Sequence, residues 1–231
     1  MTAEAPTAAE YWEDRYREGG RSWSGNVNAA LEREVSGLAP GTALDLGSGE
    51  GGDALWLARH GWRVTAIDIS PTALTVGAAA QLPGDDITWV AADLSDWQPP
   101  TSYDLVSACF LHSFVELPRE QILRRAATAV APGGTLLIVG HSGVPHWATP
   151  EHHGTSPGDD GTNAAEHAHR HAGDELPDPD SMRTALFADN PDLIEAEWEV
   201  VTSALIERPF TAPDGSTGTI SDSVLRMRRL A

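Results

Sequence analysis

A run of glycines between two apolar segments constrains the fold of this chain more than any other feature. The apolar segment Ala43–Leu46 leads into the turn Gly47–Gly52, after which apolar residues return at helical spacing. A second apolar segment, Trp62–Ile67, ends at Asp68. Glycine permits a tight turn and a close approach of the backbone to a ligand. We therefore predict a strand, a turn and a helix that bind a nucleoside-containing cofactor. The carboxylate of Asp68 is expected to bind the ribose hydroxyls of that cofactor.

The turn by itself leaves two cofactor classes open, because its sequence also satisfies the G-x-G-x-x-G pattern of dinucleotide sites. Asp45 lies inside the first strand, where a dinucleotide fold usually has an apolar residue. Ala91–Leu94 places an acid after a third strand, and Pro132–Gly134 precedes a further apolar run, Thr135–Val139. Together these four successive motifs, from Ala43 to about Gly140, resemble the class I S-adenosylmethionine-dependent methyltransferase family.

The resemblance implies a set of cofactor contacts. Matched motif by motif, the residues that would bind S-adenosylmethionine are Asp45, Gly47, Ser48, Gly49, Asp68, Ile69, Asp93 and Leu94. The first four would face the methionine end, the next two the ribose and adenine, and the last two the adenine amino group and ring nitrogen. For each of the three acids, the alternative is a structural role, in which the carboxylate only forms hydrogen bonds at the end of its strand. Methyl transfer would leave S-adenosylhomocysteine as the product.

An aromatic segment precedes the first strand. Trp12 and Tyr16 are four residues apart, so a helix would place them on one face, and Trp23 follows. This opening resembles the thiopurine and tellurite-resistance branch of the family, in which the N-terminal segment folds over the cofactor. We therefore expect residues 1–40 to form a helical lid that includes these three aromatic side chains. The alternative is that they are core aromatics of an ordinary packing helix.

The remaining pattern alternates strands and helices and so predicts a parallel sheet. The strands are expected at residues 42–46, 63–67, 87–91, 103–108, 135–139, 195–207 and 219–228. The last two have no helix between them, which indicates an antiparallel last strand. We predict an α/β, doubly wound, Rossmann-like sheet of seven mostly parallel strands, with helices on both faces, in a domain spanning residues 41–231.

Two histidines follow predicted strands at the expected site of methyl transfer. His112 lies just after the fourth strand and His141 closes the fifth. A sulfonium donor reacts by direct displacement, so the protein must hold the nucleophile in line and keep water out. Either imidazole could act as a general base, since its unperturbed pKa is about 6.5. The alternative for each is a packing role.

A histidine-rich insertion at about residues 141–180 interrupts the alternation. Its candidate metal ligands are His152, His153, His167, His169 and His171. The spacing of the last three allows two of them to meet one divalent metal ion on either a helix or a strand. The alternative is a polar loop that covers the substrate.

The composition limits the class of molecule that could accept the methyl group. The chain carries 15 Lys+Arg, all of them Arg, against 34 Asp+Glu, for a formal net charge of -19. Such acidity disfavours nucleic acids and anionic membranes as partners, so we expect a small-molecule acceptor. Oxygen, nitrogen, sulfur or a metalloid could receive the methyl group, with a weak preference for a soft or heteroaromatic acceptor.

The same composition bears on compartment and on rival functions. One cysteine, no cationic leader at the N-terminus and no long apolar run predict a cytoplasmic protein, monomeric or homodimeric. An NAD-dependent oxidoreductase is the rival enzyme class, although a chain without lysine cannot supply a Tyr-x-x-x-Lys pair. The remaining rival is a cofactor- or metal-binding protein without turnover.

Overall fold

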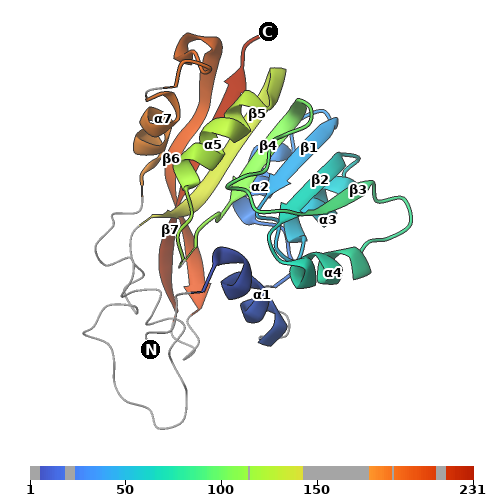
Figure 1. Cartoon of the computed structure of the whole chain (residues 1–231). Helices are drawn as coiled ribbons and strands as arrows, with labels where there is room; N and C mark the ends of the chain where they lie inside the picture. Colours follow the sequence, from blue (N-terminus) through green and yellow to red (C-terminus); the bar gives the residue numbers. More distant parts are fainter. Residues whose placement is uncertain (1–5, 19–23, 114, 143–176, 189, 212–216) are drawn as a thin grey trace, which may run out of the picture.

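The computed structural model describes residues 6–18, 24–113, 115–142, 177–188, 190–211 and 217–231. Seven strands form one sheet in the order β3-β2-β1-β4-β5-β7-β6 (Figure 1). Their bounds are β1 Thr42–Leu46, β2 Arg63–Asp68, β3 Ile87–Ala91, β4 Tyr103–Cys109, β5 Val130–Ser142, β6 Trp198–Thr211 and β7 Thr217–Arg229.

Parallel pairing runs from β3 through β2, β1 and β4 to β5, whereas β7 is antiparallel to both of its neighbours, β5 and β6. The predicted fold class, a seven-stranded Rossmann-like sheet with an antiparallel last strand, is therefore confirmed. The parallel strands all end at one edge of the sheet, and α1 lies across that edge (Figure 1).

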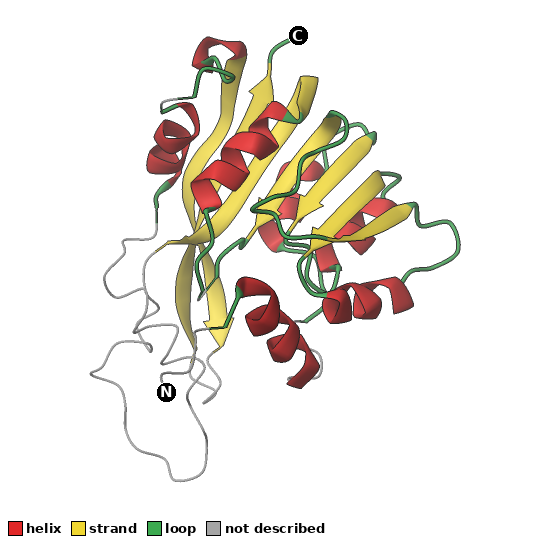
Figure 2. Ribbon diagram, in the orientation of Figure 1, coloured by secondary structure: helices red, strands yellow, loops and turns green. Residues whose placement is uncertain are grey.

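Helices cover both faces of the sheet (Figure 2). Their bounds are α1 Ala8–Glu18, α2 Ala29–Val35, α3 Gly52–Arg59, α4 Pro71–Ala79, α5 Arg119–Thr128 and α7 Pro179–Phe187, with a 3-10 turn at Glu195–Glu197.

The two faces of the sheet bury separate apolar clusters because successive strand residues point to opposite sides. One cluster packs against α5 and α7 and includes Leu44, Leu46, Val106, Ala108, Leu136 and Ile138. The other packs against α2 and α3 and includes Ala43, Val64, Ala66, Leu105, Leu137 and Val139. Asp45 lies between Leu44 and Leu46 in β1, so its side chain belongs to the α2/α3 face.

Several predicted boundaries were wrong. The fifth strand begins at Val130 rather than Thr135, and the preceding helix ends at Thr128. The strand absorbs its Pro-Gly-Gly segment in an irregularity, where the register with β4 shifts between Tyr103 and Leu105. The left-handed backbone of Gly133 (φ 81°) permits this irregularity.

The glycine turn needs glycine for two separate reasons. Gly47, Gly49 and Gly51 have φ values of 68°, 52° and 79°, a region that side chains disfavour. A Cβ atom at Gly47 would also lie 2.8 Å from the Leu111 side chain, and one at Gly51 would overlap the Trp89 indole. The turn therefore brings the backbone close to neighbouring side chains, as a cofactor-binding turn must.

Candidate functional site

Asp68, at the end of β2, is held by the backbone of the glycine turn. Its Oδ2 accepts a hydrogen bond from the Gly49 N–H at 2.8 Å, and its Oδ1 accepts one from the Ser70 N–H at 2.9 Å. The side chain is buried, and burial raises the pKa of its carboxyl group against the opposing effect of these hydrogen bonds. The predicted ribose ligand therefore joins the turn to the start of α4.

Asp45 is buried beside the same turn and is only half satisfied. Its Oδ1 accepts a hydrogen bond from the Ser107 hydroxyl at 3.0 Å, whereas its Oδ2 has no hydrogen-bond partner among the described residues. The buried hydroxyl of Ser48 likewise has none there. Burial, followed by the nearby carboxylate of Asp53, raises the pKa of Asp45 to about 8. These two orphaned oxygens fit the ammonium and carboxylate groups of an amino-acid-like ligand.

Asp53, in the first turn of α3, has a structural role. It accepts hydrogen bonds from the backbone N–H of Asn28 at 2.7 Å and from its side-chain amide at 2.8 Å. Burial raises its pKa, and the two bonds from Asn28 oppose that rise. Asp53 thus ties α3 to the start of α2.

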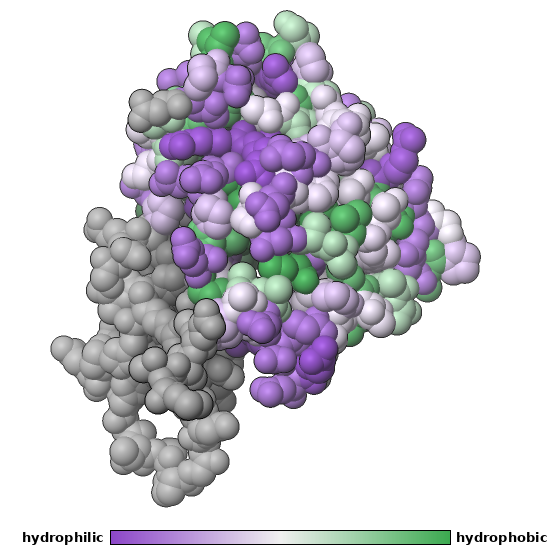
Figure 3. All heavy atoms as spheres, viewed as in Figure 1, coloured by the Kyte–Doolittle hydropathy of each residue, from purple (hydrophilic) through white to green (hydrophobic). Residues whose placement is uncertain are grey.

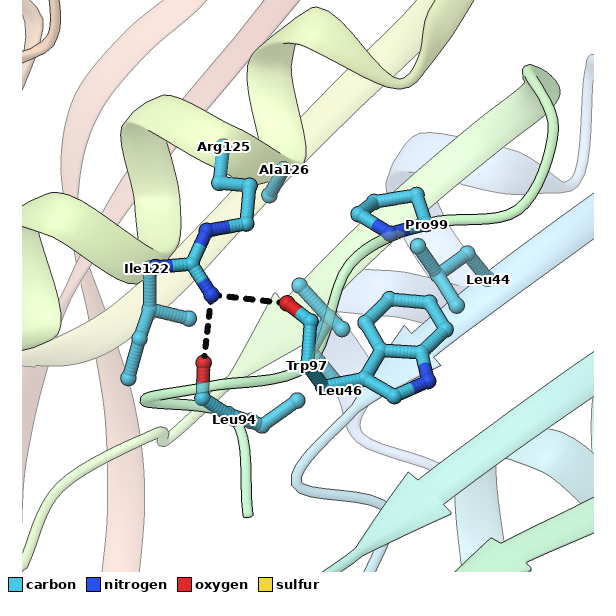
Figure 4. Close-up of a pocket in the computed structure, with 8 residues that line it drawn as sticks. All are labelled: Leu44, Leu46, Leu94, Trp97, Pro99, Ile122, Arg125 and Ala126. Atoms are coloured by element: carbon cyan, nitrogen blue, oxygen red, sulfur yellow. Dashed lines mark hydrogen bonds between the residues drawn. The ribbon is translucent and has the colours of Figure 1, made fainter. Parts of the chain in front are cut away.

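The loop after β3 presents Asp93 and Leu94. Asp93 is exposed, and its Oδ1 accepts a hydrogen bond from the Ser95 N–H at 2.8 Å. From α5, the guanidinium of Arg125 donates to the carbonyl oxygens of Leu94 at 3.1 Å and Trp97 at 2.7 Å (Figure 4). Arg125 thereby sets the position of this loop, and sequence reasoning missed it.

The small cavity in Figure 4 is bordered by Leu94, Trp97 and Pro99 of this loop. Its lining is mostly apolar and comes from β1, the loop after β3 and α5. We assign it to packing beneath the loop, because the carboxylates of the site lie at the ends of the strands instead.

Helix α1 is attached to both sides of the candidate site. The carboxylate of Glu13 accepts hydrogen bonds from the hydroxyls of Ser70 and Thr72, each at 2.6 Å, and from the Thr72 N–H at 3.2 Å. On the other side, the Trp12 indole N–H donates to the Ser113 hydroxyl at 3.1 Å. The hydrogen bonds from Ser70 and Thr72 hold the pKa of Glu13 at about 2. Sequence reasoning did not identify Glu13.

The predicted lid agrees in part with this placement. Tyr16 is buried, and its ring lies 6.1 Å from that of Trp12. Polar side chains cover the outward surface of α1 (Figure 3). Trp23 lies outside the described residues. Whether α1 acts as a lid stays a prediction.

We expect Glu13→Ala to loosen α1. Each hydrogen bond to a charged carboxylate contributes about 1.5–3 kcal/mol, so losing the bonds to Ser70 and Thr72 should accelerate amide hydrogen exchange in α1 by roughly tenfold or more. The rate of S-adenosylmethionine dissociation should rise by a similar factor. Exchange mass spectrometry and stopped-flow displacement measure the two rates.

Asp14→Ala is the matched control for this experiment. Asp14 is on the same helix and exposed, and it pairs only with Arg17, at 3.7 Å, among the ion pairs between described residues. Its replacement should leave both rates within about twofold of the wild type. Equal effects of the two substitutions would contradict the assigned role of Glu13.

The two candidate bases lie near each other but face different partners. The backbone N–H of His141 donates to the Nε2 atom of His112 at 3.4 Å, and the centres of the two rings are 5.8 Å apart. His141 also packs against the Phe110 ring, at 4.5 Å, and its Nδ1 lies 3.5 Å from the Asp222 carboxylate on β7. His112 therefore follows the end of β4, whereas His141 lies within β5, next to the last residue of that strand.

The predicted metal ligands cannot be assessed in the same way. His152, His153, His167, His169 and His171 lie outside the described residues. Within the part of the chain that the structure describes, no group of three or more His, Cys, Asp or Glu side chains could hold a metal ion. A divalent metal site in the insertion stays a prediction.

Residues 43–134 match a family described as a methyltransferase domain, and this segment contains Asp45, Asp68 and Asp93. Residues 43–134 form a methyltransferase domain. The predicted family is confirmed, and the match favours a methyl donor over the dinucleotide alternative.

Curated relatives match this chain over part of their length. A 2-heptyl-1-hydroxyquinolin-4(1H)-one methyltransferase from Mycobacteroides abscessus is 31% identical over 110 residues, 45% of this chain and 47% of that protein. Hemagglutinin 1 from Eikenella corrodens is 34% identical over 120 residues, 49% of this chain and 38% of that protein. The match thus spans less than half the length of each relative.

Solved structures resemble this chain over nearly all of its length. One concerns the conversion of a disulfide bond into a thioacetal group during echinomycin biosynthesis (TM-score 0.63, 24% identity, 97% of this chain and 92% of that one). The N-methyltransferase NodS from Bradyrhizobium japonicum, solved with S-adenosylhomocysteine, has a TM-score of 0.64 at 16% identity, covering 96% and 99%. TehB from Haemophilus influenzae has a TM-score of 0.58 at 16% identity, covering 95% and 67%.

These similarities confirm the fold, and the enzyme and cofactor classes expected from the sequence agree with them. Among the described residues, no helix is both long and apolar enough to span a membrane.

Proposed function

We propose that this protein transfers the methyl group of S-adenosylmethionine to a small-molecule acceptor. One observation carries the proposal: within a methyltransferase fold, the buried Asp45 keeps one oxygen without a partner beside the glycine turn that Asp68 holds. A buried carboxylate oxygen without a partner is costly unless a ligand satisfies it. A cationic amino-acid-like cofactor supplies such a partner.

The residues present fit this cofactor at both of its ends. Asp45, Ser48 and the glycine turn would hold the methionine moiety, and Asp68 and the loop at Asp93 would hold the nucleoside. The bound donor supplies an electrophilic methyl group on a sulfonium. The protein then has to orient the acceptor, exclude water and accept a proton where the acceptor carries one.

A small acceptor is supported by three independent features. The net charge of -19 opposes the long phosphate contacts that a nucleic acid would need. Helix α1 is hydrogen-bonded to Ser70 and Ser113 on either side of the strand ends, where a macromolecular acceptor would have to approach. The Mycobacteroides relative is described by a small heteroaromatic N-hydroxy acceptor. We extend this preference for a heteroaromatic or soft acceptor to the present chain.

The expected setting follows from the same reasoning. With a single cysteine and no disulfide framework, the protein suits a reducing compartment, so we propose that it acts in the cytoplasm as a monomer or homodimer.

Methyl-labelled S-adenosylmethionine tests the proposal directly. The protein is incubated with it and a panel containing 2-heptyl-1-hydroxyquinolin-4(1H)-one, 6-mercaptopurine, a catechol and tellurite, and separately with total tRNA and with denatured protein. We expect label on at least one small acceptor and none on the macromolecules. Label on tRNA or protein alone, or failure to bind the donor, would contradict the proposal.

A further inference from the structure

A contact between a histidine and a buried carboxylate lies beside the proposed methyl-transfer position. Asp222, on β7, is directly opposite His141 in the register of β5 with β7, and 3.5 Å separates Asp222 Oδ1 from His141 Nδ1. Both atoms are shielded from solvent, and neither has another hydrogen-bond partner among the described residues. One proton between His141 Nδ1 and Asp222 Oδ1 would therefore satisfy both atoms.

The second oxygen of Asp222 is engaged separately. Arg208, from β6, donates through Nε to Asp222 Oδ2 at 2.5 Å, and its guanidinium carbon lies 5.9 Å from the centre of the Phe110 ring. Burial by itself would raise the pKa of Asp222, but the hydrogen bonds from His141 and Arg208 outweigh it and lower that pKa. Asp222 is thus a carboxylate at neutral pH, with one oxygen fixed and the other aimed at an imidazole.

The neighbouring histidine is engaged differently. The Nε2 atom of His112 faces the backbone of β5 and accepts a hydrogen bond from the backbone N–H of His141. Glycine at position 140 leaves room for this ring, since a Cβ atom there would lie 3.1 Å from His112 Nε2. The lone pair of His112 is thereby directed at the protein backbone. His141 instead has its Nδ1 toward Asp222 and its other nitrogen on the far side of the ring, with 35% of the side chain exposed.

The pair also lies on the appropriate side of the sheet. Asp45 and Asp222 each act electrostatically on Cys109, which packs against the α2/α3 cluster. Asp222 lies two residues before Val224 of that cluster, so its side chain belongs to the same face of the sheet as that of Asp45. Phe110, directly after Cys109, adopts φ 53°, the left-handed region that non-glycine residues rarely occupy. The Phe110 ring lies 4.5 Å from the ring of His141.

We propose that His141 is the general base for a protic acceptor, and that Asp222 and Arg208 are the positioning residues that hold it. The inference rests on the proposed function. An Nδ1–H directed at Asp222 leaves the Nε2 lone pair free to take the proton of an acceptor O–H or N–H. The electron pair released from that bond then forms the bond to the methyl carbon, while the carbon–sulfur pair stays on sulfur. His141 afterwards returns its proton to solvent.

The tautomer of His141 tests the positioning without any acceptor. In protein labelled with nitrogen-15 at histidine, and assigned with His141→Gln, we expect wild-type His141 to carry its proton on Nδ1. Asp222→Asn should abolish that preference, because an amide can also donate. Glu199→Gln is the matched control, since Glu199 is also a strand carboxylate paired with an arginine, Arg228, at 2.7 Å, but is exposed.

Kinetics separates this inference from the proposed function. With the best acceptor of the panel, Asp222→Asn should lower kcat by about 100-fold, within the range of general-base catalysis, and leave the KM for S-adenosylmethionine unchanged. A proton on Nε2 in the wild type, or full activity of His141→Gln, would overturn the inference. Absence of donor binding in calorimetry would instead overturn the proposed function and leave the tautomer result standing.

Discussion

Replacing Asp68 with alanine is expected to abolish measurable binding of S-adenosylmethionine, a loss of at least about 100-fold. The substitution removes the proposed ribose ligand and also the acceptor for the Gly49 and Ser70 N–H groups. Hydrogen bonds to a charged group contribute about 1.5–3 kcal/mol each, so losing two disturbs the turn as well as the contact. Calorimetric titration at neutral pH measures the affinity.

Asp93→Ala is the control for this prediction. Asp93 is exposed, and its carboxylate accepts a local hydrogen bond from the Ser95 N–H. We therefore expect a smaller loss, of about tenfold. A melting curve in the absence of ligand shows whether each variant is folded. Affinity of a folded Asp68→Ala protein within threefold of the wild type would contradict the assignment of the site.

The affinity for S-adenosylmethionine is expected to rise with pH, by up to about tenfold per unit, until it levels off near pH 8. Burial raises the pKa of Asp45 to about 8, so this side chain is mostly protonated in the free protein at neutral pH. A cationic donor prefers the ionised carboxylate, and its binding therefore releases a proton. Asp45→Asn should bind weakly and without this pH dependence.

Stability without ligand should show the opposite trend. The folded pKa of Asp45 lies above its unfolded value, so its contribution to stability is complete at low pH and is lost as pH rises toward 8. Asp45→Asn should therefore melt at a higher temperature than the wild type at pH 8. The pKa of Glu13 is lowered, so its contribution is lost only at acid pH, as the pH falls below about 4.5 toward 2.

Ser107→Ala is the control for the pH dependence. The Ser107 hydroxyl donates to Asp45 and lowers its pKa against the effect of burial. Removing it should displace the rise in affinity to higher pH without abolishing it. A wild-type affinity that is constant between pH 6 and 9 would contradict the role assigned to Asp45.

Residues that sequence reasoning missed share one physical property: their function depends on a partner distant in the chain. Glu13 binds Ser70 and Thr72, and Arg125 binds the loop after β3. Asp222 appears in the sequence as one polar residue of an alternating strand. No local periodicity or motif encodes such pairings, because they arise only when strands are placed side by side.

The sequence alone determined the fold class, the order of strands and helices, and the three carboxylates at the strand ends. These follow from local causes: apolar periodicity selects strand or helix, glycine alone tolerates the backbone of the turn, and parallel strands bring their carboxyl ends to one edge. The tertiary structure alone showed the burial of Asp45, the attachment of α1 through Glu13, and the contact of His141 with Asp222. Each of these depends on burial and on contacts between distant segments, which set the electrostatic environment that a linear pattern does not contain.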